Sequence, residues 1–275
     1  MAKAKKRRDV ATLSPLSNLI DTHCHLDMGS FADDLDDVLK RANDHKITTI
    51  LSIGIDEDSS RKAVQLAHRY RMIFATIGIH PHDVDNILAD TFGNLSRLAE
   101  QNRTQVVGYG EIGLDYMKNY SPPETQRQQF RNQLDLARDL KLPVIIHDRE
   151  AHEDTLTILR QAAPFDHGGV LHCFSGDYTF ALQIIDLGLH LSIPGIVTFK
   201  NSRDLQEVAT RIPLDTMLLE TDGPFLAPEP WRGKRNEPYF ILYTAEKIAQ
   251  LRDIDLNDLA DQTTSNARKL FHLPK

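Results

Sequence analysis

Two histidines one residue apart follow a short apolar run near the start of the chain. His23 and His25 lie in NLIDTHCHLD, residues 18–27. Side chains at positions i and i+2 of a strand point the same way, so both imidazoles can face one site while Cys24 points away. Imidazole is a common ligand of Zn²⁺ and related divalent ions. The pair alone fits two interpretations: the first ligands of a metal site, or hydrogen-bonded structural residues at a strand end.

Four further residues of metal-binding type follow later apolar runs, each where a strand would end. They are Glu111, His147, His172 and Asp222. Each alone is explained as a structural residue, but the six together form a set of imidazoles and carboxylates that suits Zn²⁺, Mn²⁺ or Mg²⁺. Because one tetrahedral ion takes four ligands, six favour two divalent ions that share a bridging carboxylate. Cys24 and Cys173 are expected to pack as small apolar side chains.

These side chains meet only if the apolar runs are strands of one sheet. Eight runs are predicted to be strands: 18–23, 48–54, 72–80, 106–113, 143–148, 168–174, 189–195 and 216–222. Segments with apolar residues at i, i+3, i+4 and i+7, such as 31–46, alternate with them and predict helices. The alternation indicates βαβ units, and eight units in 275 residues fit a (β/α)8 TIM barrel with its site at the carboxyl ends of the strands. An open doubly wound sheet is the alternative, but the GxGxxG turn typical of it does not follow the first strand.

Composition limits the class of protein further. The chain is 41% hydrophobic and 26% charged, with a formal net charge of −7 and two cysteines. The acidic balance argues against broad nucleic-acid binding, though not against a local basic groove. The few cysteines, and the absence of an apolar run of roughly 18 residues, predict a cytoplasmic protein without a membrane span. We expect one barrel domain over residues 18–275, preceded by a basic tail, residues 1–17, that is either disordered or a phosphate-seeking arm.

Short motifs follow one another in order between Asn18 and Leu273. They are DTHCHLD, GIHPHD, GEIGLDY, PVIIHDREA, HCFSG, GIVTFKN, ETDGPFLAP and GKRNEP. Together they resemble the TatD family of metal-dependent hydrolases, which belongs to the amidohydrolase-like barrels. The sequence departs from the family pattern at Gly223 and Phe225, where members often carry a small polar residue or Ala, and then Tyr. The departure affects the lining of the pocket and not a ligand, so the identity of the substrate is left undetermined.

The resemblance implies how the ligands are divided. The first ion would be held by His23, His25, Glu111 and Asp222, and the second by Glu111, His147 and His172, with Glu111 bridging. Glu111 and Asp222 are our candidate catalytic residues. Asp222 is our candidate for the general base, since it could both bind an ion and accept a proton from water.

The resemblance further implies a deoxyribonuclease supported by Mg²⁺, often a 3′–5′ exonuclease that acts on single-stranded DNA. No obligate protein partner is evident from the sequence. Cations and aromatic residues near the predicted site suit phosphates and a stacked base. The candidate substrate contacts are His80, Arg149, Lys200, Arg232 and Arg235. Asp115 is a candidate for orienting a ligand or a loop.

Three other functions compete with this one. A related barrel could hydrolyse another ester or amide, such as an aminoacyl ester or a lactone, but many of these use a lysine where this chain has Glu111. A histidinol-phosphatase-like enzyme would be expected to end in a DxH motif, whereas here the eighth strand ends in ETDGP. A non-catalytic metal-binding protein is disfavoured by an intact ligand set at an open barrel mouth.

Overall fold

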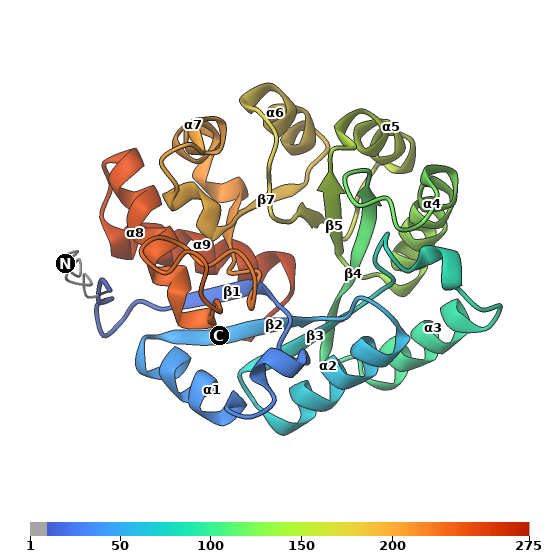
Figure 1. Ribbon diagram of the computed structural model, residues 1–275, viewed down its shortest axis with the longest axis horizontal. Helices are drawn as coiled ribbons and strands as arrows, with labels where there is room; N and C mark the ends of the chain where they lie inside the picture. The colour runs from blue at the N-terminus through green and yellow to red at the C-terminus, as the bar shows by residue number, and fades with distance from the viewer. Residues whose placement is uncertain (1–9, 275) are drawn as a thin grey trace, which may run out of the picture.

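Eight parallel strands form one sheet in chain order in a computed structural model, which describes residues 10–274 (Figure 1). The strands are β1 (Leu19–Cys24), β2 (Ile47–Ile53), β3 (Ile73–Ile77), β4 (Val106–Asp115), β5 (Val144–Arg149), β6 (Gly169–Leu171), β7 (His190–Ile193) and β8 (Met217–Leu219). A bridge between Cys24 and Gly223 joins the end of β1 to the chain just after β8. The predicted (β/α)8 barrel and its eight strand positions are confirmed.

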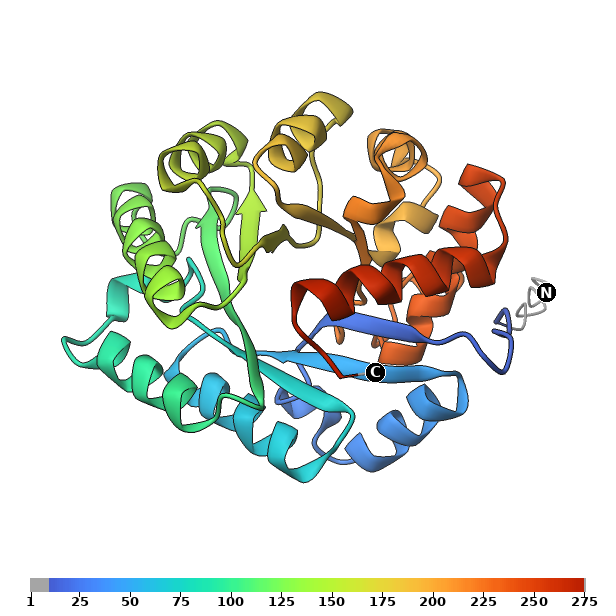
Figure 2. The same ribbon diagram turned by 180° about the vertical axis from the view of Figure 1, so that it is seen from behind.

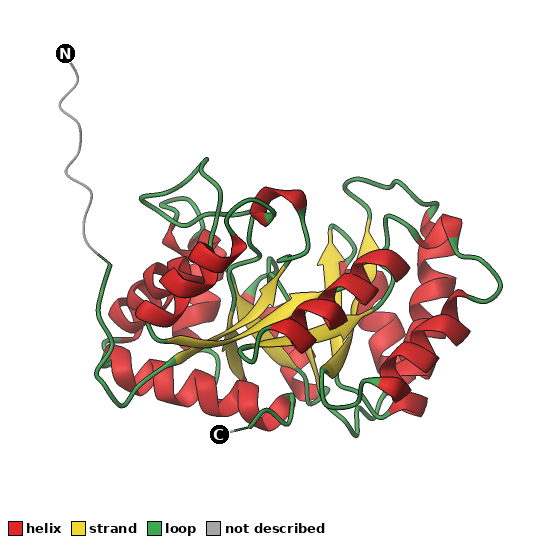
Figure 3. Cartoon of the chain, turned by 90° about the horizontal axis from the view of Figure 1, so that it is seen from below, coloured by secondary structure: helices red, strands yellow, loops and turns green. Residues whose placement is uncertain are grey.

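Helices surround the strands on the outside (Figures 1 and 3). They are α1 (Leu35–Asp44), α2 (Glu57–Arg69), α3 (Thr91–Gln101), α4 (Pro123–Leu140), α5 (His152–Ala162), α6 (Tyr178–Asp186), α7 (Arg203–Arg211), α8 (Ile241–Arg252) and α9 (Leu256–Leu270). The predicted apolar face of α1 is buried through Val38, Leu39 and Ala42. Asp56 caps α2 by accepting from the Ser59 N–H at 2.7 Å, which satisfies one of the free donors of the first turn.

Several strands are shorter than the apolar runs that predicted them. The runs 168–174 and 216–222 extend past β6 and β8, which end at Leu171 and Leu219. Cys173 and Asp222 have positive φ values of 46° and 57°, so the extended backbone ends before them. The chain therefore turns at the barrel mouth, and candidate ligands lie in these turns.

The bottom of the barrel is closed by the end of the chain. Figure 2 shows α9 on this side of the molecule. Leu270, Phe271 and Leu273 pack in one apolar cluster with inward residues of the strands, among them Ile20, Ile53, Ile145, Val170 and Leu218. The barrel interior is thus filled with side chains and leaves only the opposite, carboxyl-terminal mouth for chemistry.

Part of the predicted basic tail packs on the barrel. Leu13 is 5% exposed, and the Ser14 N–H donates to Asn257 Oδ1 of α9 at 2.8 Å. The basic run Lys3 to Arg8 lies outside the described residues, so a division of the chain at residue 17 stays a prediction. Within residues 10–274, none of the helices combines the length and apolar character needed to cross a bilayer.

Replacing Phe271 with alanine should lower the free energy of unfolding by about 3–5 kcal/mol, because the ring is 1% exposed and the cavity left under the barrel cannot collapse. Urea denaturation followed by circular dichroism measures the change. The control is Leu16→Ala, at a side chain that is 93% exposed, which should stay within about 0.5 kcal/mol of the original protein. Equal stability of the two variants would show that the C-terminal segment does not seal the barrel.

Candidate metal centre

The strands place an apolar layer in the barrel and a layer of candidate ligands directly above it. Ile145 of β5 and Val170 of β6 fill the interior, and His147 and His172 come two positions later in each case. Because side chains alternate along extended backbone, the two imidazoles point to the same side as the apolar residues that precede them. The predicted position of the site at the carboxyl ends of the strands matches this arrangement.

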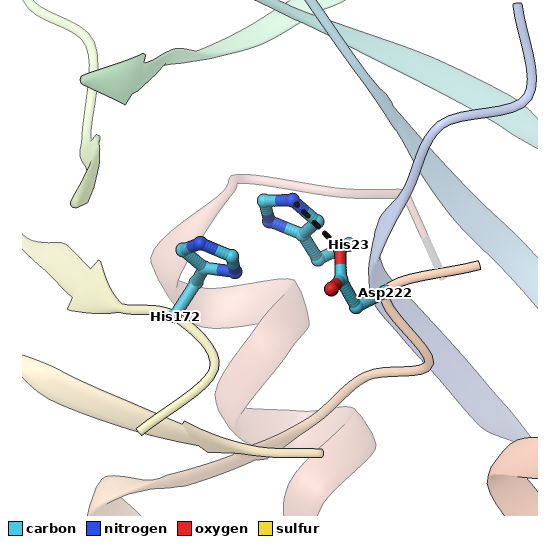
Figure 4. Close-up of side chains that lie close together, drawn as sticks. All are labelled: His23, His172 and Asp222. Atoms are coloured by element: carbon cyan, nitrogen blue, oxygen red, sulfur yellow. Dashed lines mark ion pairs between the residues drawn. The ribbon is translucent and has the colours of Figure 1, made fainter. Parts of the chain in front are cut away.

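Glu111 of β4 lies at the centre of the candidate ligands and is 3% exposed. Its Oε2 atom is 3.3 Å from His23 Nε2 and 3.8 Å from His25 Nε2. Asp222 Oδ1 lies 3.4 Å from His25 Nε2 and 3.8 Å from His23 Nε2. These four side chains form the first ligand group, and Figure 4 shows His23 and Asp222 within it.

The other carboxylate oxygen of Glu111 faces a second ligand group. Oε1 lies 2.6 Å from His147 Nδ1 and 2.7 Å from His172 Nε2. The two imidazole nitrogens are 3.3 Å apart. The rings of His172 and His23 stack at 3.8 Å between centroids, so the two groups are in direct contact (Figure 4). One carboxylate therefore divides its two oxygens between two sets of nitrogen donors.

The first group has the spacing of a tetrahedral ion site. Donor atoms about 2.0–2.1 Å from one ion stand roughly 3.3–3.4 Å from one another at tetrahedral angles. His23 Nε2 and His25 Nε2 are 3.3 Å apart, and the other distances within this group that are given above run from 3.3 to 3.8 Å. Two imidazoles and two carboxylates are donor types that a divalent cation takes, and the imidazole distances match such an ion.

Burial and the neighbouring side chains shift the pKa values of the centre in opposite directions. Burial would raise the pKa of Glu111, but the surrounding imidazoles, His172 first, keep that pKa well below its usual range. Burial would lower the pKa of His172, yet the charge of Glu111 raises it well above the usual value. Glu111 is consequently ionised and offers two anionic oxygen atoms in a site from which water is largely excluded.

Two glycines allow β4 to bring Glu111 into this position. Gly110 and Gly113 have φ values of +149° and +144°, which residues with a side chain rarely adopt. A Cβ atom on Gly113 would lie 2.0 Å from the carbonyl oxygen of His147, and one on Gly110 would lie 2.3 Å from that of Ile145. The close approach of β4 to β5, and with it the contact between Glu111 and His147, therefore depends on these glycines.

Asp222 reaches the first group because the chain after β8 is bonded to β1. The Asp222 N–H donates to the His23 carbonyl at 2.9 Å, and the His25 N–H donates to the Gly223 carbonyl at 2.7 Å. Asn236 is fully buried, and its side-chain amide donates to the carbonyls of Thr221 and Phe225 at 2.8 and 2.7 Å. The chain that follows β8 is therefore fixed where it passes the site.

Two positioning residues were not singled out from the sequence. Glu220 is fully buried; its Oε1 accepts from the Cys173 N–H at 2.7 Å and lies 3.6 Å from His172 Nδ1. Asp21 is also buried, which raises its pKa to about 8, and it accepts from the Thr221 N–H at 2.9 Å. The signal that could have found Glu220 is its place two residues before Asp222 and two residues after the inward Leu218.

Asp115, a predicted orienting residue, lies behind the second group. Its Oδ2 is 2.8 Å from His82 Nε2 and 3.4 Å from His147 Nε2. The imidazole of His147 is thus held between Asp115 on one side and Glu111 on the other, which aims Nδ1 at the centre. Cys24 is buried and its thiol faces the Gly223 carbonyl at 3.5 Å, as expected of a packed cysteine, whereas Cys173 is partly exposed.

The predicted substrate contacts occupy different places. His80 is at the centre, with Nε2 3.4 Å from Glu111 Oε1. Arg149, at the end of β5, and Lys200 are exposed. Arg232 is exposed as well, and its guanidinium lies over the ring of Phe199 at 4.5 Å. These three cations lie at the end of β5 and after β7 and β8, at the same end of the barrel as the ligand groups.

Arg235 differs from the other predicted contacts because its guanidinium is occupied within the protein. It donates to both carboxylate oxygens of Asp34, at 2.8 and 2.7 Å, and to Glu237 at 2.9 Å. A bidentate pair of this kind holds the arginine in one orientation. Its contacts favour a structural role in anchoring the loop, and a role in substrate binding stays a prediction.

Residues 20–272 match the family described as TatD related DNase. The chain belongs to this family. It is 40% identical over 255 residues to the metal-dependent hydrolase YabD of Bacillus subtilis, covering 93% of this chain and 99% of that protein. It is also 40% identical over 261 residues to the 3′-5′ ssDNA/RNA exonuclease TatD of Erwinia amylovora, covering 93% and 100%. The crystal structure of the TatD homologue YjjV from Escherichia coli superimposes with a TM-score of 0.89 at 29% identity, covering 93% and 98%.

Membership of the TatD family confirms the resemblance found in the sequence motifs. It also fixes the class of protein as a metal-dependent hydrolase. Within residues 10–274, three sets of side chains have donor atoms close enough to hold an ion: His23, His172 and Asp222; His23, His25 and Glu111; and His80, Glu111 and His147. All of them belong to the centre described above.

In this TatD protein, Glu220→Gln should weaken the binding of Zn²⁺ or Mn²⁺ about 10–100-fold without unfolding the chain. The substitution keeps the volume and an acceptor for Cys173 but removes the charge beside His172 Nδ1, which favours presentation of Nε2 to the centre. Competition with a chromogenic chelator measures the affinity, and circular dichroism checks the fold. The exposed Glu207→Gln variant is the matched control, and the same affinity in both variants would exclude a role for Glu220 in positioning His172.

Proposed function

We propose that this protein is a nuclease that uses two divalent ions, Mg²⁺, Zn²⁺ or Mn²⁺, to remove nucleotides from the 3′ end of single-stranded DNA. One observation carries the proposal: the two carboxylate oxygens of Glu111, Oε2 and Oε1, face separate ligand groups at the barrel mouth. The exonuclease relative at 40% identity supports the choice of substrate. A cytoplasmic location, expected from the sequence, fits the same function.

The ligand assignment follows the two groups. The first ion would be held by His23, His25, Asp222 and Glu111 Oε2, and the second by His147, His172 and Glu111 Oε1. When bound, such ions lower the pKa of water and polarise a phosphoryl oxygen. His80 Nε2 lies 3.4 Å from Oε1, within reach of an ion held by Glu111 and His147, and we assign it to the substrate side of that group.

Asp222 is the residue of the first group best placed to accept a proton. Its side chain is 13% exposed, whereas those of His23 and Glu111 are 0% and 4% exposed. It therefore borders the mouth, from which both water and a phosphodiester arrive, while His25 holds one of its oxygens at 3.4 Å. We assign Asp222 as the general base that takes the proton of the attacking water, and Glu111 as the residue that fixes the distance between the two groups.

The cations at the mouth would bind the phosphates next to the one that is cleaved. Arg149 lies two residues after His147, and Arg232 is held over Phe199 at 4.5 Å, so each is attached to a fixed part of the structure. Exposed guanidinium and ammonium groups attract a phosphate backbone and make binding depend on salt. Together with Lys200 they would form the local basic rim that an acidic protein needs for a nucleic-acid substrate.

After reconstitution with Mg²⁺, Mn²⁺ or Zn²⁺, single-stranded DNA should be degraded from its 3′ end faster than duplex DNA or small phosphodiesters, and RNA is assayed beside it. Gel analysis of oligonucleotides labelled at either end measures rate and direction. His147→Ala should lose nearly all activity because it removes a donor of the second group, and equal activity would indicate a contaminant. Hydrolysis of an aminoacyl ester or lactone without cleavage of any phosphodiester would refute the nuclease and favour an esterase or lactonase.

Asp222→Asn should lower kcat about 10²–10⁴-fold because an amide cannot accept the proton of water. It should still bind the second ion, whereas Glu111→Gln should lose charge at both groups and bind neither tightly. Metal content after gel filtration, measured by mass spectrometry, separates these effects from unfolding. Near-normal turnover of Asp222→Asn with both ions present would refute the assignment of the base.

A further inference from the structure

Two exposed aromatic rings border the metal centre. Phe225 is 48% exposed, and its ring meets that of His25 edge-on at 6.0 Å between centroids. Tyr120 is 66% exposed, and its ring meets that of His82 edge-on at 4.7 Å. His82 in turn lies 4.2 Å from His80, also between ring centroids. Each exposed ring therefore touches one side of the cluster of imidazoles.

The two rings stand on opposite sides of the barrel mouth. Phe225 follows β8 and Tyr120 follows β4, and these strands are four places apart in an eight-stranded barrel with consecutive neighbours. Phe225 contacts the first ligand group through His25, whereas Tyr120 adjoins the second through His82, whose ring lies 6.4 Å from that of His147. Glu111 lies between them, with one oxygen toward each group.

The backbone that carries each ring is fixed, although the ring is exposed. The Phe225 N–H donates to the Asp222 carbonyl at 2.8 Å, and its own carbonyl accepts from Asn236 at 2.7 Å. Beside Tyr120, the Ser121 hydroxyl donates to the His82 carbonyl at 2.9 Å, and the Ser121 carbonyl accepts from the Gln126 side chain at 2.8 Å. A single exposed apolar side chain needs no explanation, but two rings on anchored backbone at one site do.

We propose that Phe225 and Tyr120 form a base clamp, in which each ring stacks on one of the two bases that flank the phosphodiester at the metal centre. The proposal rests on the nuclease function proposed above and identifies what the site recognises. Ring faces accept any base, so the clamp does not select sequence. It does require bases that are free of their own stack, which accounts for a preference for single strands over duplex.

The test uses single-stranded oligonucleotides of one sequence with an abasic tetrahydrofuran unit at the last, the penultimate or neither position from the 3′ end. The original protein should show kcat/KM about tenfold lower on either abasic strand, mainly through KM. Phe225→Leu should lose the discrimination at one of the two positions and Tyr120→Leu at the other. Phe225→Tyr and Tyr120→Phe keep a ring and should keep the discrimination.

Leu16→Ala is the matched control, since Leu16 is exposed and precedes β1 at the opposite, amino-terminal end of the strand. Metal content and circular dichroism confirm that each variant is loaded and folded. Unchanged discrimination in both leucine variants, with strong cleavage by the original protein, would overturn the base clamp alone. Absence of nucleic-acid cleavage by the original protein would overturn the nuclease function and the clamp with it.

Discussion

The centre depends on a single buried carboxylate that serves two groups of donors at once. Glu111 can remain ionised at 3% exposure only because imidazoles approach both of its oxygens. Removing a charge from water costs several kcal/mol, so the ends of several different strands must deliver their side chains within a few ångströms of this carboxylate. The glycines of β4, the turn at Asp222 and the bonds between β1 and the loop after β8 all meet that condition.

The barrel can deliver these side chains because each strand carries apolar core residues and candidate ligands at different positions along its length. Apolar side chains such as Ile145 and Val170 fill the interior, and the segment around Phe271 seals it from below. Two residues further on, the same strands carry polar groups at the mouth. Behind the ligands, the carboxylates of Glu220 and Asp115 lie 3.6 and 3.4 Å from the far ring nitrogens of His172 and His147. A second layer of buried charge thus supports the polar groups at the mouth.

Local pattern was enough to predict the strands and the six candidate ligands. The apolar runs, the period-two spacing of His23 and His25, and polar residues at successive strand ends are all read from a few neighbouring positions. Glu220 was missed because its partner, the Cys173 N–H, lies 47 positions away, and because Asp222 already accounted for a ligand from that strand. The bonds of Arg235 to Asp34, 201 positions away, were equally invisible in the sequence. Long-range pairing of polar groups has no sequence period, and that limits what the sequence predicts.

The hydrogen bonds between β1 and the chain after β8 have a consequence for when the centre can form during synthesis. His23 lies in the first strand and His25 directly after it, but Asp222 joins them only when the chain after β8 has been laid against β1. During synthesis the early strands emerge long before their last partner exists. The two imidazoles of the first ligand group then exist without Asp222, and a chain that ends before Asp222 lacks the complete centre. The complete first ligand group is thus formed only when the chain after β8 has joined β1.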